Sequence, residues 1–160
     1  MPLLQLDSIR ELHDKVGQEI VVGDWLEITQ DRIDRFADAT DDRQWIHIDI
    51  ERARRESGFG STIAHGFLTL SMLSRLLNDV LKFRAVKMGV NYGFNHVRFT
   101  APVPAGARIR ARFKLNKLDD LPPLVQAQSG GVQTTWGVTV EREGSDKPCL
   151  VAEWVTRRYE

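Results

Sequence analysis

Residues 64–81 read AHGFLTLSMLSRLLNDVL. A helix over this stretch would carry apolar side chains on nearly every face: Phe67, Leu68, Leu70, Met72, Leu73, Leu76, Leu77, Val80 and Leu81. Its polar residues include the small Thr69, Ser71 and Ser74. A helix that is apolar all round is normally buried on most sides. The stretch therefore predicts a long, buried central helix over about residues 64–81.

The chain that follows this helix changes from a helical period to a period of two. Segment 108–115 alternates apolar and basic residues, which predicts a strand with one buried and one solvated face. Segments 132–140, 150–155 and 86–100 predict three more strands, with a turn at VPAG (103–106).

An antiparallel sheet that follows a very apolar helix can bury that helix by curving around it, which is an α+β arrangement. The 160 residues suit one domain, residues 1–160, with a full core. One layer of sheet around one helix leaves an open face, so we expect a homodimer.

The N-terminal third of the sequence predicts short helices and irregular chain. Apolar spacing predicts a helix over Ser8–Val16, and Thr29 can cap a second helix that ends near Thr40. This places DDRQWIH (41–47) in a loop. A further short helix is expected over Asp49–Arg55.

Composition favours a soluble protein. Lys plus Arg and Asp plus Glu each number 22, so no net charge favours nucleic acid or an anionic membrane. The single cysteine, Cys149, cannot form an intrachain disulfide. The N-terminus lacks the basic region of a signal peptide, and no stretch has 18 uninterrupted apolar residues. We expect a cytoplasmic protein that binds neither membrane nor nucleic acid.

The segment DDRQWIH places Asp42 five residues before His47, with Trp45 and Ile46 against the histidine. A lone histidine beside apolar residues is more often structural than catalytic. An aspartate near an imidazole can, however, hold its tautomer or share a water with it. Five residues do not place the two on one helix face, so a loop must bring them together. The segment is either an acid–base pair or a charged helix end.

Two residues mark the start of the predicted central helix. Free N–H groups at a helix N-terminus stabilise negative charge, so the N–H of Gly66 is a candidate oxyanion donor. A tight turn would explain the glycine equally well. His65 has a plain explanation as a capping or packing residue.

The sequence lacks the common cofactor and nucleophile motifs, among them GxGxxG, the P-loop, HExxH and GxSxG. Its histidines, at positions 13, 47, 65 and 96, have no metal-ligand spacing. We therefore expect no metal and no cofactor.

Three blocks together resemble a known family: TDDRQWIH (40–47), IAHGFLTLS (63–71) and VNYGFNHVRFTAPVPAG (90–106). The chain resembles the MaoC-like hot-dog dehydratases, or (R)-specific enoyl-CoA hydratases, and within them the NodN-like branch. The family motif runs roughly Ser-Gly-Asp-x-Asn-Pro-Leu-His. Asp42 falls on its catalytic aspartate and His47 on its catalytic histidine. Asp41 replaces glycine, Gln44 asparagine and Trp45 proline.

The resemblance implies a hot-dog fold and a homodimer. It also implies a hydro-lyase that adds water to a trans-2-enoyl thioester, or removes it, with an (R)-3-hydroxyacyl-CoA as the hydrated form. Asp42 and His47 would hold the water, and the Gly66 N–H would bind the thioester oxygen. Neither metal nor redox cofactor is needed.

Substrate contacts are expected from four further residues. The acyl chain would lie against Trp45, Phe67 and Leu68, and Arg98 would meet the phosphates of CoA. The thioester would be carried by CoA or by acyl-carrier protein.

Two other functions remain open. Thioesterases of this fold usually use a carboxylate on or near the central helix, and residues 64–78 contain no Asp or Glu. A non-catalytic acyl-CoA-binding module would leave Asp42 and His47 without a chemical role.

Overall fold

The computed structural model describes residues 3–124 and 130–160. Its strands are β1 (Leu4–Leu6), β2 (Glu19–Val22), β3 (Leu26–Glu27), β4 (Leu81–Phe83), β5 (Met88–Phe99), β6 (Arg108–Leu121), β7 (Gly131–Arg142) and β8 (Leu150–Tyr159). Its helices are the 3-10 helix η1 (Ile9–Lys15) and the α-helices α1 (Gln30–Thr40), α2 (Trp45–Ile48), α3 (Ile50–Glu56), α4 (Gly66–Ser71) and α5 (Leu73–Asn78).

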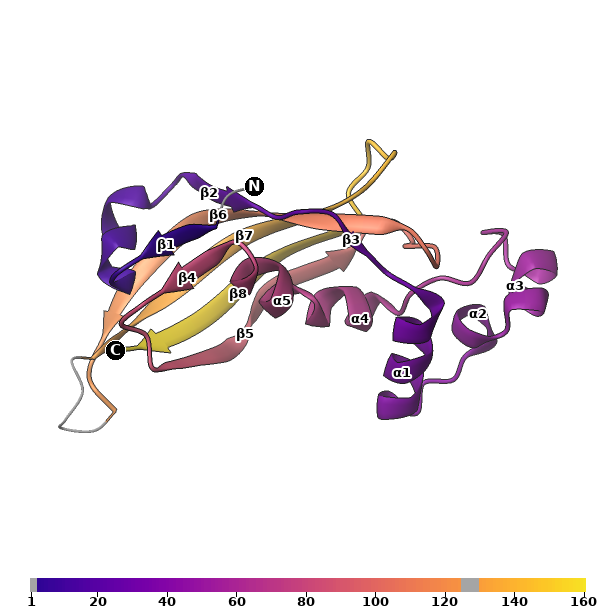
Figure 1. Ribbon diagram of the computed structural model, residues 1–160, viewed down its shortest axis with the longest axis horizontal. Coiled ribbons are helices and arrows are strands. Elements are labelled where there is room, and N and C mark those ends of the chain that lie inside the picture. The colour runs from indigo at the N-terminus through magenta and orange to yellow at the C-terminus, as the bar shows by residue number, and fades with distance from the viewer. Residues whose placement is uncertain (1–2, 125–129) are drawn as a thin grey trace.

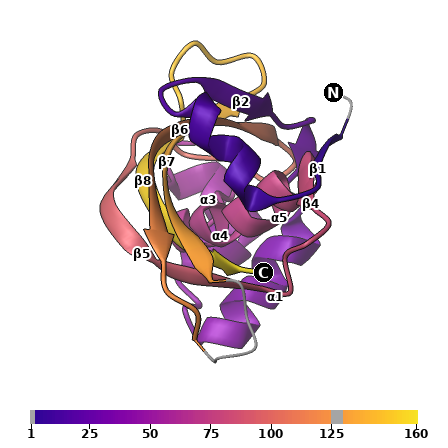
Figure 2. The same ribbon diagram turned by 90° about the vertical axis from the view of Figure 1, so that its left-hand side faces the viewer.

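The main sheet is antiparallel and runs in the order β2-β6-β7-β8-β5, with β3 also paired to β6. It curves around α4 and α5, as the end-on view shows (Figure 2). Strands β1 and β4 form a separate parallel pair. The hot-dog arrangement expected from the sequence, a curved sheet around central helices, is confirmed.

The core lies between the sheet and these helices because the strand faces alternate as their sequences predict. On β6 the apolar members Ile109, Ala111, Phe113 and Leu115 are fully buried. They join Leu73 and Leu77 of α5 in one cluster. The neighbouring basic residues of β6 lie on the other face and form ion pairs such as Arg112–Glu19.

The central helix is shorter than predicted and is interrupted. It consists of α4 and α5 with a break at Met72, and it ends at Asn78. The prediction of one helix to residue 81 was wrong because the chain turns at Asp79 and Val80, and the buried Leu81 begins β4, where it pairs with Leu4 of β1. An all-round apolar pattern does not distinguish the end of a buried helix from the start of a buried strand.

The N-terminal third contains three strands that the sequence analysis missed. Strands β1, β2 and β3 are short, with 3, 4 and 2 residues. Strands of that length have too few alternations to give a period-two signal. The helix expected over Ser8–Val16 is present as the 3-10 helix η1, with Ser8 in a capping box.

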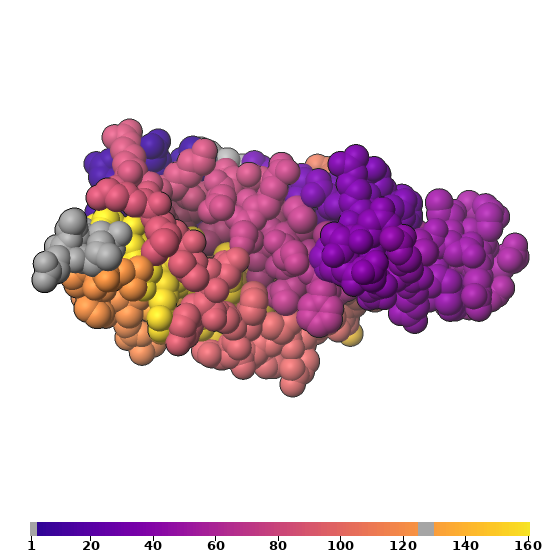
Figure 3. Space-filling model, turned by 90° about the horizontal axis from the view of Figure 1, so that it is seen from below, coloured from indigo at the N-terminus to yellow at the C-terminus, as the bar shows by residue number. Residues whose placement is uncertain are grey.

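Helices α1, α2 and α3 project beyond one end of the sheet (Figures 1 and 3). The predicted cap is confirmed: Thr29 accepts a hydrogen bond from the N–H of Arg32. The short helix expected from Asp49 is present as α3, with Asp49 as its cap accepting from the N–H of Arg52. Segment 41–47 is not wholly a loop, because α2 begins at Trp45. In the described part of the chain, every helix is too short or too polar to cross a membrane.

Candidate active site

Asp42 follows directly on the end of α1. The preceding residue, Asp41, caps the helix with φ of 58°, in the left-handed region that favours glycine. This conformation gives a physical reason for the glycine at this position of the family motif, and aspartate is one of the few other residues that tolerate it. Asp41 therefore turns the chain, and the turn exposes Asp42, whose side chain is 54% accessible.

His47 lies on α2 and is buried. Its Nδ1 is 2.7 Å from the carbonyl oxygen of Ile63. A carbonyl oxygen only accepts, so Nδ1 carries the proton and donates it. In the neutral ring Nε2 then keeps a lone pair, which is the form that a general base requires.

Gln30 of α1 fixes the position of α2. Its Nε2 donates to the carbonyl oxygen of His47 at 2.8 Å, and its Oε1 accepts from the hydroxyl of Thr62. This one amide therefore joins α1, α2 and the segment before α4. The sequence analysis missed Gln30, because its place near the start of a helix predicts only a solvated residue.

His65 joins Asp42 to His47. Its Nε2 donates to the backbone carbonyl oxygen of Asp42 at 2.9 Å and lies 3.9 Å from the Oδ2 of Asp42. Its ring stacks on that of His47, with centroids 3.7 Å apart and an interplanar angle of 24°. Its Nδ1 is buried and has no hydrogen-bond partner among the described residues. A capping or packing role was expected for this histidine, but its contacts connect both halves of the predicted pair.

Burial lowers the pKa of His47 below its ordinary value of 6.5. Desolvation is the main cause, and the neighbouring His65 lowers the pKa further. The hydrogen bond to Ile63 and the charge of Asp42 oppose this shift. Burial therefore favours the neutral form of His47.

Asp42, His47 and His65 each offer a metal-ligating atom, and these atoms lie within 4.8 Å of one another. The geometry favours hydrogen bonding over metal binding. Ring lone pairs lie in the ring plane, and two rings stacked nearly parallel direct them side by side, not toward a single point. In addition, His65 Nε2 and His47 Nδ1 both bind carbonyl oxygens.

A cavity of about 350 Å³ adjoins His47 and Gly66. Its walls are otherwise largely apolar and include Phe59, Ile63, Ala64, Phe99, Ala101, Pro102 and Val103. The N–H of Gly66, at the first residue of α4, has no hydrogen-bond partner among the described residues. A methyl group at position 66 would lie 2.8 Å from the ring of Phe99, so glycine permits the close approach of this wall.

The four residues expected to bind substrate lie apart from the walls of this cavity. Phe67 is 66% exposed and packs edge-on against Phe99, with ring centroids 5.7 Å apart. Trp45 lies under the guanidinium of Arg52, Leu68 is buried in the core, and Arg98 is exposed on β5.

Comparison with known proteins adds to this geometry. The sequence model of the MaoC-like domain matches residues 11–136. The chain belongs to the MaoC-like dehydratase family. It is 47% identical over 151 residues to 3-hydroxyacyl-thioester dehydratase Z of Mycobacterium tuberculosis (strain ATCC 25618 / H37Rv), covering 94% of this chain and 95% of that protein. It is 44% identical over 153 residues to nodulation protein N of Rhizobium leguminosarum bv. viciae, covering 93% and 89%.

Its fold is similar to that of an R-hydratase from Pseudomonas aeruginosa, with a TM-score of 0.64 and 23% identity over 88% of this chain and 79% of that one. The predicted membership of the MaoC-like hot-dog dehydratases, in their NodN-like branch, is confirmed.

Proposed function

We propose that this MaoC-like protein is a hydro-lyase that interconverts a trans-2-enoyl thioester and the corresponding (R)-3-hydroxyacyl thioester, with Asp42 and His47 as its acid–base pair. The observation that carries the proposal is the buried His47, whose Nδ1 is bound to the carbonyl oxygen of Ile63, beside Asp42 and on the wall of an apolar cavity. The relative from M. tuberculosis is named for 3-hydroxyacyl-thioester dehydration, which is the same reaction class.

In the hydration direction, the Asp42 carboxylate and His47 Nε2 hold a water molecule against C3 of the substrate. The water oxygen forms a bond to C3, and one water proton passes to the pair. The C2–C3 π electrons move toward the thioester oxygen and give an enolate. C2 then takes a proton from the pair, and the thioester carbonyl forms again.

The enolate oxygen needs a hydrogen-bond donor, and the unpartnered N–H of Gly66 is placed on the same cavity to supply one. Removal of one such donor typically costs about 10²–10³ in rate. Thr69 also lines the cavity.

His65 is a positioning residue in this proposal. Its Nε2–H holds the backbone of Asp42, and its ring face supports that of His47. The two acid–base groups come from a loop and a four-residue helix, neither of which is rigid by itself. His65, which is 2% exposed, ties both to the start of α4.

The acyl chain would lie on the apolar walls around Phe59, Phe99 and Val103, with Phe67 at the edge of Phe99. The carrier is CoA or acyl-carrier protein. Contacts of the substrate with Trp45, Leu68 and Arg98 stay predictions from the family resemblance.

The proposed assembly is a homodimer formed at β5. This strand is a twelve-residue edge of the main sheet, and an unpaired edge of this length is a ready site for pairing with another chain. Its exposed apolar residues include Val90, Tyr92 and Phe94. Antiparallel pairing of two copies would continue the sheet and cover these side chains.

The test is loss of the conjugated enoyl absorbance when the purified protein meets crotonyl-CoA, with Asp42→Asn and His47→Gln measured alongside. Each variant should lose about 10²–10⁴ in turnover while keeping its circular dichroism spectrum. Asp41→Asn is the matched control, because asparagine also tolerates positive φ and should stay within a few-fold of the native rate.

Chiral analysis of the product tests the (R) configuration. Release of free CoA in place of hydration would show a thioesterase. Tight binding without turnover, over several chain lengths, would show an acyl-binding module and would overturn the assignment of Asp42 and His47.

A further inference from the structure

A second cavity, of about 600 Å³, lies at the opposite end of the central helix from Gly66. Ser74 and Asn78 of α5 contribute to its wall, together with residues of β4, β5 and β8. Asn78 is 12 residues beyond Gly66, which corresponds to roughly 18 Å along a helix. None of its lining residues belongs to the cavity around His47.

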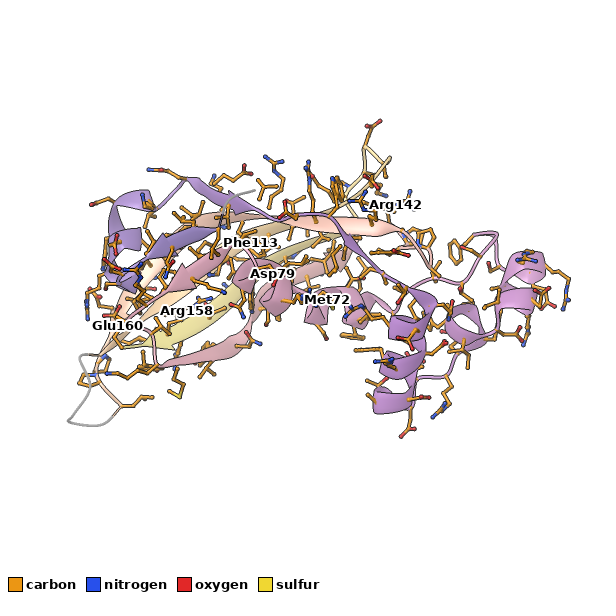
Figure 4. All side chains as sticks on the ribbon, in the orientation of Figure 1. Met72, Asp79, Phe113, Arg142, Arg158 and Glu160 are labelled. Carbon is orange, nitrogen blue, oxygen red and sulfur yellow. The ribbon has the colours of Figure 1, made fainter. Side chains whose placement is uncertain are left out.

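Arg158 of β8 is the distinctive residue of this cavity. It lies at the end of the sheet away from α1, α2 and α3 (Figure 4). Its Nη1 donates to the hydroxyl of Thr156 at 2.7 Å, and its guanidinium carbon lies 5.5 Å from the ring centre of Phe83. Burial lowers the pKa of Arg158 to about 10, so the side chain is still charged at pH 7.

This guanidinium has no carboxylate partner within the described residues. The nearby acids are committed elsewhere: Asp79 pairs with Arg75 at 3.1 Å, and Glu160 accepts hydrogen bonds from Ser8 and Ile9. Residues 1–2 and 125–129 contain no Asp or Glu in sequence. A partly buried charge is costly unless it is paired, so an unpaired guanidinium in a cavity favours an anionic ligand.

The remaining lining residues agree with a negatively charged ligand. Lys82 adds positive charge, and the cavity wall contains no acidic residue. The guanidinium of the adjacent Arg157 lies instead over the ring of Tyr92 and donates to Gln133. Asn78, Asn91 and Ser74 add hydrogen-bonding groups, with Asn91 donating to the hydroxyl of Ser74 at 3.2 Å. The other face of the cavity is apolar: Leu81, Phe83, Val86, Val90 and Trp154.

We propose that this cavity is a binding site for a small amphipathic anion, whose carboxylate or phosphate group pairs with Arg158 and whose apolar part lies against Phe83 and Trp154. Arg158 presents a planar donor fork that suits either head group. The site does not depend on the hydratase proposal, because it shares no residue with that chemistry.

Isothermal titration of the native protein with octanoate tests the proposal, with octanamide as the neutral isostere and inorganic phosphate as the anion without an apolar part. Arg158→Met should weaken octanoate binding at least about tenfold, as expected for loss of a charged hydrogen bond. Arg158→Lys keeps the charge and should retain part of the affinity. Arg110→Met removes a partly buried arginine that is already paired with Glu141, and should leave octanoate binding unchanged.

Four results would overturn the proposal. Octanamide could bind as tightly as octanoate, which would show that the charge has no role. Phosphate could bind as tightly as octanoate, which would show that the apolar wall has no role. Octanoate could bind Arg158→Met as it binds the native protein, which would place its site elsewhere. The native protein could fail to bind octanoate, in which case Arg158 has another counter-ion, such as an acid of a second copy.

Discussion

The rings of His47 and His65 stack 3.7 Å apart, although each histidine donates to a different carbonyl oxygen. His47 is held from the chain before α4, through Ile63, while His65 reaches back to Asp42. The two hydrogen bonds therefore join the segment that contains Asp42 and His47 to the segment that contains Ile63 and His65. Movement of either segment would disturb both hydrogen bonds and the stack, so the pair fixes the distance between Asp42 and His47.

His65→Leu should lower kcat by up to about 100-fold, because misplacement of a catalytic group by 1 Å can cost that much. His65→Gln keeps a donor near the position of Nε2 and should recover part of kcat. The pH profile of activity distinguishes positioning from a purely structural role, because a purely structural role would leave its acid limb unchanged. Loss of His65 removes an influence that lowers the pKa of His47, so the acid limb should move to higher pH in His65→Leu. An unchanged limb and unchanged kcat would exclude the positioning role.

The pH dependence of kcat/KM should reflect neutral His47. Since burial lowers its pKa below 6.5, activity should persist as pH falls to 6.5 and decline only at lower pH. Between 6.5 and the folded-state pKa, the unfolded chain binds more protons, so the free energy of unfolding should also fall as pH falls. His47→Gln should reduce this slope. An acid limb centred above 6.5 would contradict the prediction.

Substitutions of Asp41 test the strain in the backbone turn that precedes Asp42. Asp41→Gly should be as stable as the native protein or slightly more stable, because glycine adopts a φ of 58° without strain. Asp41→Val should lose about 1–2 kcal/mol of unfolding free energy, the cost of left-handed backbone for a residue with a branched side chain. Chemical denaturation measures both. Asp38→Val, on the regular part of α1, is the control for valine in an exposed helical position.

Gly66→Ala should destabilise the protein by about 1–3 kcal/mol, because the added methyl group would overlap the ring of Phe99. Phe99→Leu in the same chain should restore part of the lost stability by removing that overlap. Thermal unfolding of the single and double variants measures whether Phe99→Leu restores the stability that Gly66→Ala removes. Additive effects of the two substitutions would show that the contact is not the cause.

Tyr92→Glu should convert the proposed dimer to a monomer, since Tyr92 lies near the middle of β5 and two copies would bring like charges together. The side chain is 57% exposed, so the single chain should stay folded. Sedimentation velocity measures the change, with Tyr92→Phe as the conservative control. A native protein that sediments as a monomer would contradict the proposed interface.

The sequence predicted the strands of the sheet well because β5, β6, β7 and β8 have 10 to 14 residues each, which is long enough to show alternation. It failed where elements are short, as at β1, β2 and β3. It also failed to locate the end of the central helix, since Leu77 in the helix and Leu81 in the following strand are both apolar and buried.

The candidate pair Asp42 and His47 could be proposed from sequence because both residues fall within one motif. The cooperation of Gln30 and His65 could not be predicted in the same way. Their contacts reach 17 and 23 residues along the chain, and they depend on how α1 packs beside α2. Local spacing contains no information on such contacts.

Phe99 ends the edge strand β5 and also forms part of the wall beside Gly66. The shape of the cavity around His47 therefore depends on where the sheet edge lies. A compound that wedges between Phe99 and Phe67 would displace one end of the edge strand as it fills the cavity. If the proposed hydratase site and β5 dimer both hold, such an inhibitor would act on turnover and on assembly together, and resistance to it would require compensating changes in both.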